Sequence, residues 1–148
     1  MTLQELCRQL GQMAKAQKLI RFSAAGASLG ELNPIQLEWY PFIFIIPSGT
    51  HTVTDDTTRF DLTIYYCDRL LEDDTNELDV MSAAIENLKN ILVGARLLEG
   101  VVDVENTYTI RNFMPTKQND RLAGAYAQVR ITVANNTICF VPGDEPEE

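Results

Sequence analysis

The stretch DDTNELDVMSAAIENLKNILVGARLLEG, residues 73–100, decides the fold. Apolar residues recur in it at steps of three and four, the spacing that places side chains on one face of an α-helix. The expected stripe consists of Leu78, Met81, Ala84, Ile85, Leu88, Ile91, Leu92 and Ala95. We expect Asp74 to cap the N-terminus, with Glu77 three residues later, and Gly100 to end the helix as its C′ residue. A stripe this wide, over about six turns, predicts a helix that packs across a sheet.

Strand patterns flank this helix on both sides. Apolar and polar residues alternate in 59–66 and again in 122–133, which is the two-residue period of a half-buried strand. The predicted inward residues are Phe60, Leu62, Ile64 and Tyr66 in the first strand, and Ala125, Ala127, Val129, Ile131 and Val133 in the second. Further strands are predicted at Leu37–Ile46, where Pro41 indicates an edge or a bulge, and at Val101–Arg111. A short edge strand is predicted at Thr137–Val141.

Turns and loops separate these strands. Pro47-Ser48-Gly49 predicts a turn. The segment Thr50–Thr58 that follows is polar but rich in β-branched residues, and it predicts a long hairpin arm that projects beyond the core. Ser23–Gly30 consists mostly of small residues, but it lacks the Gly-Lys-Ser/Thr ending of a phosphate-binding loop. We therefore expect a flexible loop there.

An N-terminal helix completes the pattern. Thr2 and Glu5 have the spacing of a capping box, and an apolar stripe follows up to about Lys18. With no repeat and no linker, the sequence predicts one α+β domain over residues 1–142, in the order α-β-β-α-β-β. Its sheet should be mostly antiparallel, with the long helix across one face. Residues 143–148, GDEPEE, predict an acidic, disordered tail.

The charge balance limits the partners. The chain has 21 acidic and 12 basic residues, for a net charge of −9. This excess argues against ordinary binding to the nucleic-acid backbone, which needs clustered Lys and Arg. The acidic excess either keeps the protein soluble or forms an acidic wall that repels the DNA phosphates, so that DNA passes without binding. The longest apolar run, Phe42–Ile46, is too short to span a bilayer, and we see no signal peptide, so a cytoplasm is the expected compartment.

Residues with catalytic or metal-binding chemistry are few. The three cysteines, Cys7, Cys67 and Cys139, are far apart and are expected to be small buried residues. His51 is the single histidine and is expected in an exposed loop, which disfavours a catalytic triad or a zinc site. Asp55-Asp56 lacks a calcium-loop pattern, and Glu72-Asp73-Asp74 is explained by the adjacent helix N-terminus. We expect no enzymatic activity, no metal and no cofactor.

Residues 57–133 contain motifs of one known group of proteins. Asp68-Arg69-Leu70 ends a strand and Asp73-Asp74-Thr75-Asn76 follows; the helix then holds residues 85–91, IENLKNI. Phe113-Met114-Pro115 and residues 120–127, DRLAGAYA, lead into the last strand. This half of the chain resembles small proteins from the structural modules of phages and prophages, particularly those infecting gut Bacteroidales. The order of elements resembles that of tail-terminator and neck-ring subunits of tailed phages.

The resemblance implies a structural virion protein that forms a homo-oligomeric ring around the DNA channel, at the head–tail junction or at the end of the tail. It would assemble in the host bacterial cytoplasm as a ring of six or twelve copies. Its partners would be further copies and neighbouring tail-tube or connector proteins. DNA would pass as cargo without specific binding, and no membrane or cofactor would be involved.

Two sets of residues are candidates for this role. The expected subunit-interface residues are Trp39, Phe42, Thr52, Val53, Thr54, Phe113, Met114 and Arg121. The expected channel-facing acids are Asp55, Asp56, Asp73 and Asp74. The aromatic residues around Trp39 and Phe42 are either an exposed edge or ordinary core. The alternatives to a ring subunit are a phage adaptor that forms no ring, an acidic inhibitor that mimics DNA, and an enzyme.

Overall fold

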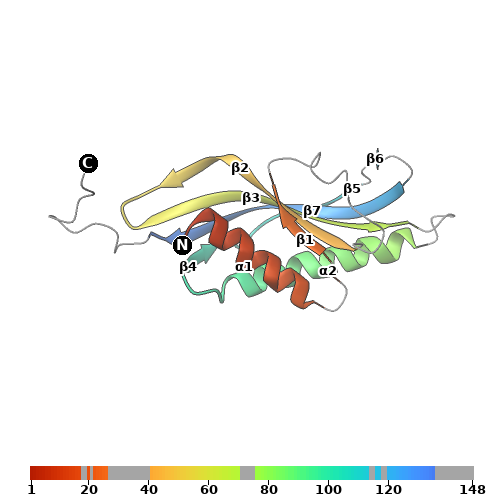
Figure 1. Ribbon diagram of the computed structural model, residues 1–148, viewed down its shortest axis with the longest axis horizontal. Helices are drawn as coiled ribbons and strands as arrows, with labels where there is room; N and C mark the ends of the chain where they lie inside the picture. Colours follow the sequence, from red (N-terminus) through yellow and green to blue (C-terminus); the bar gives the residue numbers. More distant parts are fainter. Residues whose placement is uncertain are drawn as a thin grey trace, which may run out of the picture.

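The computed structural model of this chain describes residues 1–17, 20, 22–26, 41–70, 76–113, 116–117 and 120–135. Its elements in chain order are α1 (Leu3–Ala16), β1 (Phe22–Ala25), β2 (Phe42–Val53), β3 (Thr57–Arg69), α2 (Glu77–Ala95), β4 (Val101–Val104), β5 (Ile110–Phe113), β6 (Thr116–Lys117) and β7 (Asp120–Ala134). The predicted α+β class is confirmed: a mostly antiparallel sheet carries the long helix α2 across one face (Figure 1).

The two longest strands form the centre of the sheet. The strand order is β1-β2-β3-β7-β4, and β5 and β6 also pair with β7. β3 and β7 stay in register from the pair Thr57–Ala134 to the pair Arg69–Leu122. β1 pairs in parallel with β2, whereas the other pairings between described strands are antiparallel. The β3–β7 pair therefore forms the centre of the sheet and contributes side chains to both of its faces.

Both helices pack against the same face of the sheet. α1 buries Leu6, Leu10 and Ala14. α2 buries Val80, Ala84, Asn87, Leu88, Ile91, Leu92 and Ala95. The inward residues predicted for β3 and β7 are all buried and form one apolar cluster with these helix residues, so the predicted alternation is confirmed. Removal of this apolar surface from water is the main force that holds helices and sheet together.

The opposite face of the sheet carries no described helix. On β3, Arg59, Asp61, Thr63 and Tyr65 alternate with the buried residues and therefore point away from α1 and α2. Their cross-strand partners on β7 are Thr132, Arg130, Gln128 and Tyr126. We call this side of the sheet the open face. No helix in the described part of the chain is long and apolar enough to cross a membrane.

Both predicted helix ends need correction. Leu78 is 77% exposed and so does not belong to the buried stripe, which begins at Val80. The first helical residue is Glu77 and the N-cap position is Asn76, while Asp74 lies outside the described residues. At the other end the helix stops at Ala95. Gly100 has φ +92° in the turn that leads into β4, so it serves this turn and is not the C′ residue.

Several predicted strand limits are also wrong. Pro47-Ser48-Gly49 is not a turn, because β2 continues through it with a register shift against β3 between Pro47 and His51. The predicted strand Val101–Arg111 is broken into β4 and β5, which pair with successive parts of β7. Part of the predicted loop Ser23–Gly30 is β1. The predicted strand Thr137–Val141 and the tail 143–148 lie outside the described residues.

Candidate subunit interface on the hairpin and the open face

The predicted hairpin arm is present, but it is not free-standing. β2 and β3 pair up to Val53 and Thr58, and the two-residue turn Asp55-Asp56 lies beyond them. However, β3 also pairs with β7 at Thr57 and Thr58, so β7 supports the arm along its whole length. Residues 50–56 are exposed as expected of such an arm, but β3 remains paired with β7 as far as Thr57.

The outer edge of β2 carries no described strand along the hairpin. β1 pairs with β2 from Phe42 to Ile45, and the N–H of Gly26 donates to the carbonyl oxygen of Ile45 at 3.0 Å. Beyond Ile45, no described strand pairs with this edge. The predicted interface residues Thr52, Val53 and Thr54 lie here and are exposed, with Val53 68% exposed. An open strand edge offers unpaired backbone N–H and C=O groups to another chain.

Phe42 does not fit the predicted interface. It is 1% exposed, and its cross-strand partner Cys67 on β3 is buried as well. The core alternative is therefore correct for Phe42. Trp39, Met114, Asp73 and Asp74 lie outside the described residues. Phe113 and Arg121 take part in strand pairing with β7 and β6, and their side chains are outside the described part.

Asn135 fixes the shape of the hairpin turn. Its backbone N–H donates to the carbonyl oxygen of Asp56 at 2.8 Å. Its side-chain amide donates to the carbonyl oxygens of Thr54 and Asp55 at 2.9 and 3.1 Å. Within the turn, the N–H of Thr54 donates to the carbonyl oxygen of Thr57 at 2.8 Å. These bonds use the backbone groups of the turn and leave the Asp55 and Asp56 carboxylates exposed.

Replacing Asn135 with alanine should lower the free energy of unfolding by about 1–2 kcal/mol, because two carbonyl oxygens of the turn lose their donor and Thr58 loses its acceptor. Urea denaturation measures this loss. Asn106→Ala is the matched control, since Asn106 is exposed and has no hydrogen-bond partner among the described residues. An Asn135→Ala variant as stable as this control would show that the turn does not depend on Asn135.

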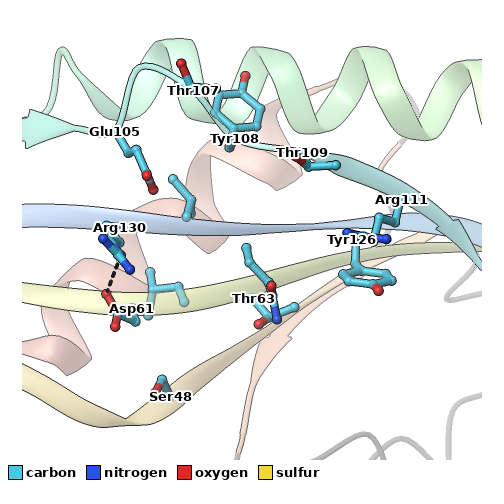
Figure 2. A pocket seen from close by; sticks show the side chains of 13 residues that line it. Ser48, Asp61, Thr63, Glu105, Thr107, Tyr108, Thr109, Arg111, Tyr126 and Arg130 are labelled. Atoms are coloured by element: carbon cyan, nitrogen blue, oxygen red, sulfur yellow. Dashed lines mark ion pairs between the residues drawn. The ribbon is translucent and has the colours of Figure 1, made fainter.

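A polar groove of about 460 Å³ lies on the open face. β3 and β7 form its floor, and the segment between β4 and β5 forms one wall with Glu105, Thr107 and Tyr108 (Figure 2). Ser48, at the register shift of β2, lies on the opposite side, and Arg111 of β5 lies at one end. The break between β4 and β5 and the irregularity in β2, both missed in the sequence, are the features that shape this groove.

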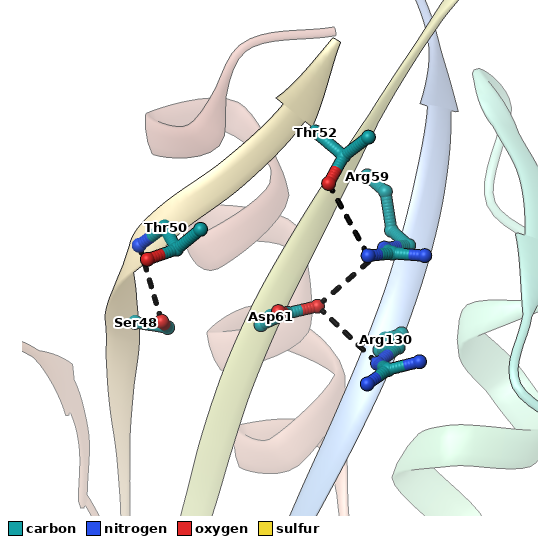
Figure 3. Close-up of polar contacts among 6 residues, drawn as sticks. All are labelled: Ser48, Thr50, Thr52, Arg59, Asp61 and Arg130. Carbon is teal, nitrogen blue, oxygen red and sulfur yellow. Dashed lines mark hydrogen bonds and ion pairs between the residues drawn. The ribbon is translucent and has the colours of Figure 1, made fainter.

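Asp61 forms ion pairs with two arginines of the open face. One of its carboxylate oxygens lies 3.7 Å from the Nε atoms of both Arg59 and Arg130 (Figure 3). Arg59 precedes Asp61 by two residues on β3, and Arg130 is its cross-strand partner on β7. Arg59 also donates to the hydroxyl of Thr52 at 3.2 Å. Half-exposed ion pairs of this kind add little stability. We infer that their role is to orient the two guanidinium groups.

Arg111 adds a third guanidinium group to the groove. It is exposed and forms no ion pair with the described residues. Its cross-strand partner Tyr126 stacks at a tilt on Tyr65, with ring centroids 5.3 Å apart. Burial, followed by the neighbouring Tyr126 and Cys67, raises the pKa of Tyr65 above its usual value. Tyr65 is therefore neutral at physiological pH, and the charged residues that line the groove are Arg111, Arg130, Asp61 and Glu105, with Arg59 beside them.

The groove lining is polar and carries both cationic and anionic side chains. The described part of the chain contains no cluster of His, Cys, Asp or Glu that could hold a metal ion. His51 is exposed as expected, but it lies in β2 and not in a loop, and its ring packs edge-on against Phe60 at 5.2 Å. Cys67 is buried, and Cys7 is half-buried on α1, where burial raises the pKa of its thiol.

The sequence did not single out the groove residues. Arg59, Asp61 and Arg130 occupy outward positions of alternating strands, which is a signal that the sequence does carry. Their meeting depends on the β3–β7 register, which sets Arg130 opposite Asp61 and which alternation alone does not fix. No protein-family model matches this chain, and a search of curated proteins likewise found no match.

Proposed function

We propose that this protein is a ring-forming structural subunit of a tailed phage, located at the head–tail junction or at the end of the tail. In this proposal six or twelve copies surround the DNA channel and contact tail-tube or connector proteins. The subunit works without catalysis or a cofactor. DNA passes through the ring as cargo.

The observation that supports this proposal is the presence of two unlike exposed surfaces on one subunit. The open edge of β2 with the exposed turn Asp55-Asp56 forms one surface, and the groove on the open face forms the other. A closed ring needs such unlike surfaces, because each subunit contacts its two neighbours through different parts of itself. Edge strands that natural proteins leave open are also common sites of association between chains.

The charge distribution favours this function over a DNA-mimic inhibitor. A mimic needs acidic groups spaced like phosphates along one face. Here the open face combines Arg59, Arg111 and Arg130 with Asp61, and the other described acids are spread over both helices, the hairpin turn, several strands and the segments on either side of β4. An adaptor that binds a phage protein without forming a ring remains the second candidate, because a single open edge is sufficient for that role.

Electron microscopy of the purified protein in negative stain tests the proposal. We expect closed rings of uniform diameter with a central channel, and class averages with six-fold or twelve-fold symmetry. Particles without a channel, or open filaments, would contradict the proposal. A compact complex of one copy with a tail-tube or connector protein would instead favour the adaptor.

A further inference from the structure

We propose that the acidic turn Asp55-Asp56 of one copy docks into the groove on the open face of the next copy, against Arg111 and Arg130. This contact would be the repeated interface of the ring, so the inference rests on the proposed function. It names the occupant of the groove as a second copy of this chain, and it assigns Asp55 and Asp56 to the interface in place of the channel wall.

The turn is already shaped for docking. Asp55 and Asp56 are exposed, and their side chains make no ion pair or hydrogen bond with the described residues. The turn backbone is held by Asn135 and by the hydrogen bond between Thr54 and Thr57. A turn that is fixed before binding loses little conformational freedom on docking, which favours association.

The groove presents guanidinium groups to an incoming carboxylate. Two guanidinium groups, from Arg111 and Arg130, line it together with the carboxylates of Asp61 and Glu105, and Arg59 lies beside it in an ion pair with Asp61. The lining itself therefore contains as many guanidinium groups as carboxylates, and Arg111 lies at one end of it. Asp61 is shared between Arg59 and Arg130, which keeps both arginines oriented before binding. Arg111 has no described ion-pair partner, and an incoming carboxylate would give it one.

The turn of a subunit cannot occupy its own groove. Asp56 precedes Asp61 by five residues on an extended strand, a separation of about 16 Å along β3. β3 remains paired with β7 over this whole length, so it cannot fold back. The contact must therefore be between copies, and it joins two unlike surfaces. Repetition of such a contact gives a ring when the rotation closes.

Charge reversal on each side tests this contact. The turn variant is Asp55→Arg with Asp56→Arg, and the groove variant is Arg111→Glu with Gln128→Glu, where Gln128 is an exposed groove residue. We expect each variant to raise the apparent dissociation constant of the ring at least about tenfold, because like charges would meet at every interface. Light scattering over a range of concentrations measures the loss of mass.

Restored assembly is the decisive result. A chain carrying both sets of substitutions again has opposite charges on turn and groove, and it should regain the ring mass. A one-to-one mixture of the turn variant and the groove variant should also assemble, with the two chains alternating. Partial unfolding of a variant cannot produce this rescue. Glu86→Arg with Glu99→Arg is the matched control for the turn variant, because it replaces two exposed acids with arginines away from the turn and the groove, and it should leave the mass unchanged.

The outcomes separate this inference from the proposed function. A wild-type ring that persists in the turn variant, or a combined variant that stays dissociated, would overturn the docking of Asp55-Asp56 and leave the ring function standing. An undiminished ring mass in the turn variant is also the result expected if these acids face the channel. A wild-type protein that forms no ring would remove the proposed function itself.

Discussion

Replacing Gly124 with alanine should destabilise the protein by at least about 3 kcal/mol, because the new methyl group has no space between the two central strands. Gly124 lies on β7 opposite Cys67 of β3. A Cβ atom there would overlap the carbonyl oxygen of Tyr66, and it would lie 2.8 Å from the Tyr66 carbonyl carbon and 3.1 Å from the Cys67 Cα. All three are backbone atoms, so only separation of β3 from β7 could relieve the overlap.

Urea denaturation followed by circular dichroism measures this effect. Gly49→Ala is the matched control: Gly49 is exposed in β2, and a Cβ there meets no atom within 4 Å. Its free energy of unfolding should stay within about 0.5 kcal/mol of the wild type. A Gly124→Ala variant that unfolds at the same urea concentration as Gly49→Ala would mean that β3 and β7 do not approach each other as closely as described.

Truncation of Leu88 should have the next largest effect. Leu88 lies in the middle of α2, is 0% exposed and belongs to the apolar cluster between the helix and the sheet. Leu88→Ala removes buried carbon atoms and leaves a cavity, so we expect a loss of about 3 kcal/mol. That is a large share of the roughly 5–15 kcal/mol by which domains of this size are stable.

Leu78 provides the control for this measurement on the same helix. Leu78 is 77% exposed although the sequence pattern placed it in the buried stripe. Leu78→Ala should change the free energy of unfolding by less than about 0.5 kcal/mol, because its side chain is already in water. Equal losses for Leu78→Ala and Leu88→Ala would contradict the orientation of α2 on the sheet.

Much of the fold follows from periodicity. The stripe of α2 and the alternation in β3 and β7 each contain enough repeats to fix both the element and its buried face. Short or irregular elements do not. β1 has four residues and gains its place by pairing with β2, which local sequence does not reveal. Pro47 and Gly49 resemble a turn, yet β2 passes through them, because its pairing with β3 continues on both sides of the register shift.

The candidate site was predictable in part. The polar, β-branched segment Thr50–Thr58 does form a hairpin end with exposed residues. Its support by β7 was not predictable, because it comes from pairs such as Thr58–Val133 between residues far apart in the chain. The groove depends on the same long-range register and on the break between β4 and β5. Charged residues on an outward strand face indicate solvent exposure, and only the register shows which of them meet.

The mass of the purified wild-type protein in solution, measured by light scattering across a range of concentrations, tests the ring most directly. We predict a closed species of six or twelve subunits of 16.6 kDa each, whose mass stays constant above the concentration at which the ring forms. A mass that corresponds to one subunit at every concentration, or one that grows without limit, would contradict a ring that closes through the hairpin turn and the groove.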